Sequence, residues 1–194
     1  GTYNPYSVTS ISVTATSQHY LVTISGGGVY EWDAITSTWT SRGDAIILRD
    51  LSNVSNTFSY NSWASIPNQA KALNQILPIY NGATLQGYIL LNSEFQEISQ
   101  TYYCGVYYCD RYVNPSWQWI ALDVSNTSND FGWNKSKPCA NINTALITPN
   151  NKLIIGKNGN LFITNNADLT NPVNSHWQQI YTNNKSLSCA GTWD

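Results

Sequence analysis

Charged residues are scarce in this sequence. Only 10% of its 194 residues are Asp, Glu, Lys or Arg, whereas a typical soluble domain has about 25%. Glu occurs 3 times and Met not at all, so the chain is poor in the residues that build helical bundles. Its 9 Lys and Arg residues are spread singly along the chain. Because there is no basic stripe, we expect no nucleic-acid partner.

Long apolar runs are also missing. Uninterrupted stretches such as Ala45–Leu48 are far shorter than the roughly 18 residues that suggest a membrane-spanning helix. Hydrophobic residues still make up 42% of the chain, so it can bury a core and is not disordered by composition. We therefore expect a single domain over residues 1–194, with no membrane span.

Neutral polar and aromatic residues take the place of charge. Asn, Ser and Thr account for 63 residues, and the chain has 13 Tyr and 8 Trp. Strand-like runs recur throughout and are broken every 8 to 12 residues by Gly, Asn or Pro, which is typical of all-β proteins. Residues 68–77 are the one ambiguous segment. Their apolar spacing fits a helix ended by Pro78, and a strand is equally plausible.

The sequence contains internal repeats. Residues 134–140 (NKSKPCA) recur 50 positions later as 184–190 (NKSLSCA). Trp133 precedes the first copy by one position, and the same Trp-to-Ala spacing occurs 70 residues earlier, from Trp63 to Ala70. A fainter copy starts at Trp39. We interpret the recurrent Trp and Ala first as packing residues between and within the repeats.

A second motif, made of a strand, a turn and a strand, accompanies the first. Leu21 to Tyr30 spans nine positions, as does Leu153 to Phe162, and a looser copy occupies 81–120 with an apparent insertion at 91–103. Units of about 40 to 50 residues built from short antiparallel strands are the sequence form of propeller blades. We therefore predict an all-β, β-propeller-like fold of about four blades.

The repeat resembles those of secreted propeller lectins of the tachylectin and tectonin kind. Their blades combine Leu-(Ile/Gly)-Gly-x-x-Gly-x-Leu-(Tyr/Phe) with a closing Trp-x-x-Ile, and the corresponding segments here are 153–162 and Trp117–Ile120. The resemblance implies a propeller and a lectin-like function. This chain departs from the family pattern, because its repeats are unequally spaced and residues 40–62 fit poorly. The expectation is three clear repeats and one irregular one.

The last repeat stops at Asp194, and the N-terminus starts in mid-repeat. The C-terminal segment would complete the first blade within the same chain, in cis, and so remove an exposed sheet edge. Alternatively it would complete a blade of a neighbouring copy, in trans, and build rings or filaments. Both alternatives remain open from the sequence.

Several features favour an extracellular location. The chain begins at Gly1, so we expect any initiator Met or signal peptide to have been removed. We expect the four Cys to form disulfides, with 104–109 preferred and the other two paired with each other or with another chain. The cysteines are Cys104, Cys109, Cys139 and Cys189. Possible N-glycosylation sites are Asn53, Asn126, Asn134 and Asn184, a number that chance also produces in so Asn-rich a chain.

Signatures of catalysis are weak. Glu31 and Asp33 lie two apart on one expected strand, which would place two carboxylates on one face, but alternation alone produces such pairs often. His19 and His176 are isolated, and no calcium loop, phosphate loop or nucleophile motif occurs. We expect no enzyme activity, no cofactor and no metal.

The composition favours carbohydrate binding. Sugars are bound by aromatic faces together with side chains that hydrogen-bond hydroxyl groups, and this chain is rich in both. The candidate binding residues lie around the Gly-aromatic turns and before the closing Trp. They are Tyr30, Trp32, Asp33, Tyr108, Asp110, Asn114, Asn165, Asn166 and Asp168.

Two functions follow from these features. The first is a secreted, lectin-like protein whose partners are glycans or glycoproteins. The second is a structural subunit of an extracellular filament or coat, whose copies assemble head to tail by strand exchange through the incomplete C-terminal repeat. Low charge, abundant Tyr, spare Cys and the incomplete repeat favour the second. The sugar specificity is not determined by the sequence.

Overall fold

The computed structural model of the chain is all-β in its described parts. Every regular element is a strand, apart from one short 3-10 helix, η1 (Trp63–Ser65), and no helix there is long and apolar enough to cross a membrane. The residues described are 5–14, 17–24, 27–49, 57–66, 73–98, 101–110, 116–121, 142–150, 152–157, 160–164 and 177–182.

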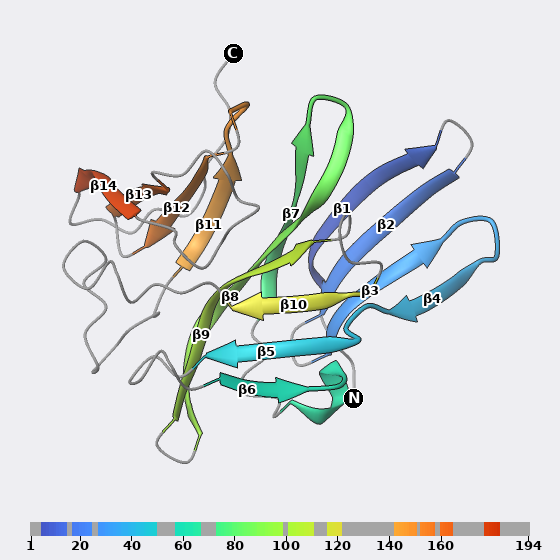
Figure 1. Ribbon diagram of the computed structural model, residues 1–194, viewed down its shortest axis with the longest axis horizontal. Coiled ribbons are helices and arrows are strands. Elements are labelled where there is room, and N and C mark those ends of the chain that lie inside the picture. The colour runs from blue at the N-terminus through green and yellow to red at the C-terminus, as the bar shows by residue number, and fades with distance from the viewer. Residues whose placement is uncertain are drawn as a thin grey trace.

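The first sheet is a four-stranded antiparallel meander with the order β1-β2-β3-β4. Its strands are β1 (Pro5–Thr14), β2 (Ser17–Ile24), β3 (Gly28–Asp33) and β4 (Thr38–Ser41). Consecutive strands pair with one another, as expected for segments joined by short Gly-rich and polar turns. This sheet lies on the right in Figure 1, where the β3–β4 hairpin reaches away from the rest of the molecule.

The second sheet has six strands in the order β6-β5-β10-β9-β8-β7. Four of them form another antiparallel meander: β7 (Leu73–Asn81), β8 (Thr84–Ile98), β9 (Thr101–Asp110) and β10 (Gln118–Ala121). The hairpin of β5 (Ala45–Arg49) and β6 (Thr57–Tyr60) is added to it, because β5 pairs in parallel with β10. The segment that fits the repeats poorly thus extends the second sheet instead of forming a sheet of its own.

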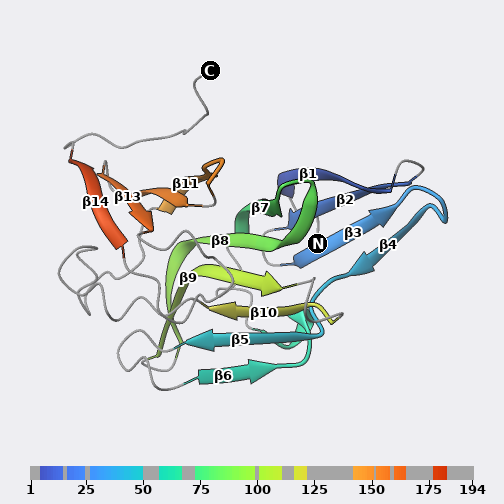
Figure 2. The same ribbon diagram turned by 45° about the horizontal axis from the view of Figure 1, so that its top comes forward.

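The third sheet is again a four-stranded antiparallel meander, ordered β11-β12-β13-β14. Its strands are β11 (Ile142–Ile147), β12 (Leu153–Lys157), β13 (Asn160–Thr164) and β14 (Trp177–Thr182). The described strands of the three sheets do not close into a ring, and the first and third sheets lie on opposite sides of the second (Figures 1 and 2).

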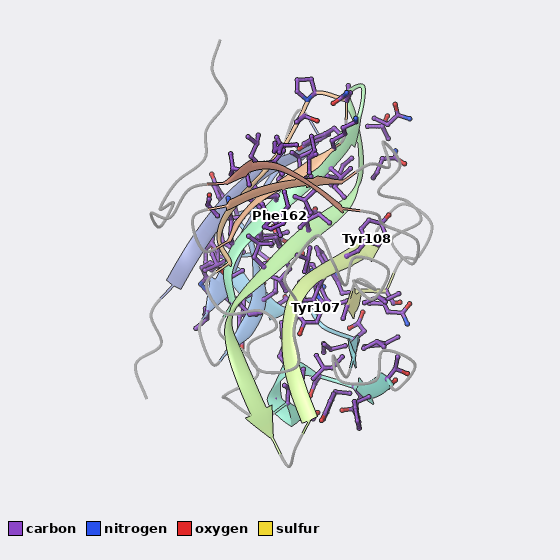
Figure 3. The ribbon with its side chains drawn as sticks, turned by 90° about the vertical axis from the view of Figure 1, so that its left-hand side faces the viewer. Tyr107, Tyr108 and Phe162 are labelled. Atoms are coloured by element: carbon purple, nitrogen blue, oxygen red, sulfur yellow. The ribbon has the colours of Figure 1, made fainter. Side chains whose placement is uncertain are left out.

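Strands β7, β8 and β9 of the second sheet carry buried side chains on both faces. Successive side chains of a strand point to opposite faces, and residues 88–91 of β8 are all buried. One set faces a core shared with the first sheet: Tyr88, Leu90, Tyr107 and Cys109. The other set faces a core shared with the third sheet: Ile89, Leu91, Val106 and Tyr108. Figure 3 labels Tyr107 and Tyr108 of β9 and Phe162, the β13 member of the second core.

The carbonyl of Arg42 joins the first sheet to the second. The indole N–H groups of Trp63 and Trp119 both donate to this oxygen, at 2.9 and 2.8 Å. The N–H of Arg42 itself donates to the carbonyl of Val29 on β3, at 2.8 Å. Because three elements meet at one residue, we call this region the Arg42 junction. Trp63 is 1% exposed and Trp119 0%, so both indoles serve as packing.

The positions of strands β7, β8 and β9 decide two expectations from the sequence. The helix alternative is wrong for residues 73–77, which form part of β7, and Pro78 does not end an element. Proline is tolerated there because β7 is the last strand of its sheet, where a missing N–H interrupts no ladder on the outer side. The insertion at 91–103 lengthens β8 and β9 into one hairpin.

The preferred 104–109 disulfide does not fit the strand that contains it. Cys104 and Cys109 both belong to β9, and five residues of extended chain separate their Cα atoms by about 16 Å. A disulfide requires a Cα separation below about 7 Å. Cys109 is buried in the core between the first and second sheets. Cys139 and Cys189 lie outside the described residues.

Candidate functional site

Three aromatic residues form a row across the first sheet. The pairing register places Tyr20 of β2 opposite Trp32 of β3, and Trp32 opposite Trp39 of β4. Residues that are direct partners in antiparallel strands project to the same face of the sheet. We call Tyr20, Trp32 and Trp39 the aromatic row. Tyr30, which pairs with Ser41 and Val22, lies on the same face beside it.

The row lies on the face of the first sheet that points away from the second sheet. The residues that alternate with it, Leu21 and Val29, are 0% exposed and belong to the core between the two sheets. Because Leu21 and Val29 point into that core, the side chains next to them along β2 and β3 must project to the other face of the sheet. The row therefore follows directly from the burial of its sequence neighbours.

Exposure increases along the row toward the edge of the sheet. Tyr20 and Trp32 are partly buried, whereas Trp39 is 55% exposed. All four residues of β4 are exposed, and β4 is the last strand of its sheet. The Trp32 and Trp39 rings lie with centroids 5.2 Å apart and planes inclined by 46°. An indole that is more than half exposed offers apolar surface to a ligand.

A polar turn holds the hairpin that carries the row. Asp33 accepts hydrogen bonds from the N–H of Ile35 at 2.8 Å and from the hydroxyl of Thr36 at 2.9 Å. The hydroxyls of Thr36 and Thr38 are 2.8 Å apart, and Ser37 has a left-handed φ of 53°. An aspartate that bonds the backbone two residues ahead forms an Asx turn. Asp33 thus shapes the hairpin and does not project from it toward a ligand.

The face of the row carries no charged side chain among its described residues. Glu31 and Arg42 belong to the opposite side, where the Arg42 Nε donates to the Glu31 carboxylate at 2.6 Å, and the Asp33 carboxylate is hydrogen-bonded within the turn. Glu31 is only 8% exposed, and the Arg42 guanidinium also lies over the Trp117 ring, 5.6 Å from its centroid. Arg42 therefore faces the second sheet, and the row presents a neutral surface.

The structure separates the residues expected to bind carbohydrate. Tyr30 and Trp32 lie together on the exposed face of the first sheet, whereas Asp33 holds the turn. Tyr108 is only 4% exposed and packs in the core between the second and third sheets, so it is not available to a ligand. Asp110 is the last residue of β9. The remaining candidates lie outside the described residues: Asn114, Asn165, Asn166 and Asp168.

Sequence reasoning missed two members of the row. Tyr20 was not singled out, and Trp39 was interpreted as a packing residue of a faint repeat, which its exposure contradicts. The signal that identifies them is the hairpin register, since Trp32 and Trp39 flank the Asp33–Thr38 turn symmetrically. Counting outward from that turn places both indoles on one face.

The other expected sites lie largely outside the described ranges. This applies to the four possible glycosylation sites, Asn53, Asn126, Asn134 and Asn184. Within the described parts of the chain, no group of three or more His, Cys, Asp or Glu residues is arranged to hold a metal ion. Comparison of the chain with protein-family models, with characterised proteins and with solved structures finds no match.

Proposed function

We propose that the protein binds neutral carbohydrate through the aromatic row and does not act on it chemically. The observation that carries this proposal is the exposed indole of Trp39, continuous with Trp32 and Tyr20 on one uncharged face. Tyr30 and Trp32 belong to the candidate set derived from the sequence. A lectin-like role is therefore supported by residues that both lines of reasoning select.

The chemistry of sugar recognition fits this surface. The C–H face of a pyranose ring is apolar and packs on an aromatic ring, while its hydroxyls need hydrogen-bonding neighbours. Ser41 pairs with Tyr30 on the same face of the exposed edge strand as Trp39, and its hydroxyl supplies such a group. Contiguous exposed apolar surface marks a binding site, and Trp39 is 55% exposed beside the partly buried rings of Trp32 and Tyr20, so a ligand that covers the row accounts for it.

A binding function without catalysis is supported by the roles of the two carboxylates on β3. Glycoside hydrolysis uses two carboxyl groups about 5 to 10 Å apart that flank the scissile bond. The Glu31 carboxylate is hydrogen-bonded to Arg42 on the buried side, and the Asp33 carboxylate is hydrogen-bonded within the turn. Neither faces the aromatic row.

The architecture we propose is propeller-like. Three antiparallel meanders correspond to the three clear repeats, and they stack face to face through two cores. Each meander buries its inner face against a neighbour, as blades do. The β5–β6 hairpin corresponds to the irregular repeat. An extracellular location remains part of this proposal and depends on composition alone.

Binding is tested by replacing Trp39 with alanine and screening both proteins against an array of neutral and charged glycans. Ile35→Ala is the matched control, because Ile35 is 73% exposed on the same hairpin but lies in its turn, outside the row. The proposal expects Trp39→Ala to weaken the best signals by about tenfold or more, equivalent to about 1.4 kcal/mol, and Ile35→Ala to leave them unchanged. Equal binding by all three proteins, or no binding by the parent, refutes it.

A second candidate function is a structural subunit that assembles head to tail. On the third sheet, Leu146, Ile154 and Ile163 form a register row on the face opposite the core, and Ile180 is 47% exposed. We propose that this face would pack on the first sheet of another copy and continue the stack of sheets. The strand-exchange form of assembly depends on residues 183–194, which lie outside the described ranges.

Light scattering distinguishes the two candidates. The assembly hypothesis expects particles larger than 21.6 kDa that dissociate in both Ile154→Asp and Trp39→Ala. The binding hypothesis expects particles of the same size in the parent and in Trp39→Ala. Assemblies that depend on Trp39 would show that the row is an interface between copies, and would exclude it as a glycan-binding surface.

A further inference from the structure

We infer that the ligand of the aromatic row is a single, hydrated chain of a linear neutral polysaccharide with β-1,4 linkages, lying across strands β2, β3 and β4. This inference rests on the proposed function and specifies its substrate class. It differs from recognition of one terminal sugar in a pocket and from adhesion to a crystalline polymer surface. Three features of the row lead to it: its length and openness, the inclination of its indoles, and its neutrality.

The length and openness of the row favour several sugar units. Adjacent strands lie about 4.8 Å apart, so the row from Tyr20 to Trp39 spans about 10 Å, which exceeds the width of one pyranose ring. A site for a single small molecule is a concavity that encloses most of its ligand. Here the row ends at β4, whose four residues are all exposed, so a longer ligand passes over the sheet edge without obstruction. The β3–β4 hairpin projects outward in both ribbon views (Figures 1 and 2).

The inclination of the indoles favours a twisted single chain. The Trp32 and Trp39 ring planes differ by 46°. The two rings therefore form two separate facets, each suited to one sugar ring. In a flat β-1,4-linked ribbon, successive sugar rings are related by a half turn and their planes are nearly parallel, whereas in a relaxed single chain the rotation departs from a half turn and neighbouring ring planes become inclined. A crystalline polymer surface is flat and would contact only one facet at a time.

The neutrality of the row favours an uncharged polymer. The described side chains on this face are aromatic, aliphatic or hydroxylic: Tyr20, Val22, Tyr30, Trp32, Trp39 and Ser41. A polyuronate or sulfated glycan would gain affinity from basic side chains at the site. The nearest one, Arg42, is held by Glu31 on the other side of the sheet, so a polyanion has no partner here.

Chain-length dependence is the direct test. Affinities of the full-length protein are measured by titration calorimetry and tryptophan fluorescence for glucose and for β-1,4-glucan oligomers of two to six units, with the N-acetylglucosamine series in parallel. We expect no measurable binding of the monosaccharides and at least about a tenfold gain in affinity from the disaccharide to the hexasaccharide in one series, because each further stacked ring adds free energy. Tyr20→Ala and Trp39→Ala should each reduce hexasaccharide affinity several-fold, while Ile35→Ala should not.

Polymer probes complete the test. In gels containing soluble hydroxyethyl cellulose, the parent should be retarded and Trp39→Ala should not, whereas polygalacturonate should retard neither and microcrystalline cellulose should capture little of either. Tight binding of a monosaccharide that depends on Trp39 would overturn the polysaccharide inference and leave the proposed carbohydrate function intact. Trp39-dependent capture by microcrystalline cellulose, or retardation by polygalacturonate, would overturn it in the same way. Absence of binding to every sugar would refute the proposed function itself.

Discussion

The Arg42 junction and the aromatic row use the same residue type for opposite purposes. Trp63 and Trp119 are buried at the junction, whereas Trp39 is more than half exposed in the row. Both groups belong to short antiparallel strands or to their connections, in segments that the repeats would assign to packing. The difference is whether a second layer covers the face from which the indole projects. The identity of the residue does not predict its role, and the coverage of its face does.

The indole N–H groups of the two buried tryptophans, Trp63 and Trp119, are hydrogen-bonded inside the protein. Each N–H of Trp63 and Trp119 donates to the Arg42 carbonyl, which satisfies the donor that makes a buried Trp costly. The Trp63 and Trp119 ring centroids lie 6.3 Å apart, and Trp117 stacks on Tyr88 at 5.4 Å. These rings fill the space between two sheets, so their removal leaves a cavity.

Replacing Trp119 with alanine is expected to have the largest effect on stability. The substitution removes a fully buried indole and one donor to Arg42, and buried Trp→Ala changes cost about 3–5 kcal/mol. The free energy of unfolding is measured by urea denaturation followed by circular dichroism. In a domain at the lower end of the usual stability range, about 5 kcal/mol, a loss at the upper end of this estimate would leave folded and unfolded protein in comparable amounts.

Trp119→Phe separates the cavity from the hydrogen bond. Phenylalanine keeps most of the ring volume and loses the N–H donor, so we expect a loss of about 2 kcal/mol. If Trp119→Ala and Trp119→Phe destabilise the protein equally, cavity formation does not explain the effect. If neither destabilises it, Trp119 is not buried at a structural junction.

The contact between Gly28 and Trp63 provides a second way to break the junction. Gly28 has a φ of 109°, and a Cβ at this position would overlap the Cγ and Cβ of Trp63. We expect Gly28→Ala to cost about 3 kcal/mol, because backbone strain and overpacking add. Gly82→Ala is the control: its φ is 59° but nothing lies within 4 Å of the added Cβ, so only the left-handed backbone costs free energy, about 1 kcal/mol.

The difference between these two glycine variants carries the test. Both are measured by thermal and urea unfolding under identical conditions. Equal losses of stability would mean that Trp63 does not lie against Gly28, since the φ of 109° at Gly28 should by itself cost at least as much backbone strain as the φ of 59° at Gly82. A larger loss for Gly82→Ala would reverse the expected order and contradict the packing of the junction.

Short antiparallel strands could be predicted from the sequence, but the addition of the β5–β6 hairpin to the second sheet and the direction of the side chains could not. The spacing from Leu21 to Tyr30 equals that from Leu153 to Phe162, and both pairs lie on the second and third strands of a meander. Leu21, Leu153 and Phe162 are buried in the two cores, yet Tyr30 is on the exposed face. Equal spacing therefore did not produce equal orientation.

The cause of that difference is one residue of turn length. Strand β2 ends at Ile24 and β3 begins at Gly28, which leaves three residues between them, whereas Lys157 and Asn160 enclose two. A shift of one residue reverses which side chains face the core. The aromatic row therefore depends on the pairing register of the strands and on which face of the sheet is covered. The spacing between repeats gives neither, which is why the sequence assigns Trp39 to packing.

Replacing Trp39 with alanine is expected to have the smallest effect on stability and the sharpest effect on binding. The substitution removes a cross-strand aromatic pair on an exposed edge, which contributes about 1 kcal/mol or less. No cavity forms, because no second sheet covers the ring among the described residues. Unfolding in urea should shift slightly, while binding of the sugar identified by the array is lost. A loss of stability comparable to that of Trp119→Ala would mean that the Trp39 face is covered, by another part of the chain or by another copy. The contrast between a covered and an uncovered indole would then disappear, and head-to-tail assembly would replace carbohydrate binding as the better account of the first sheet.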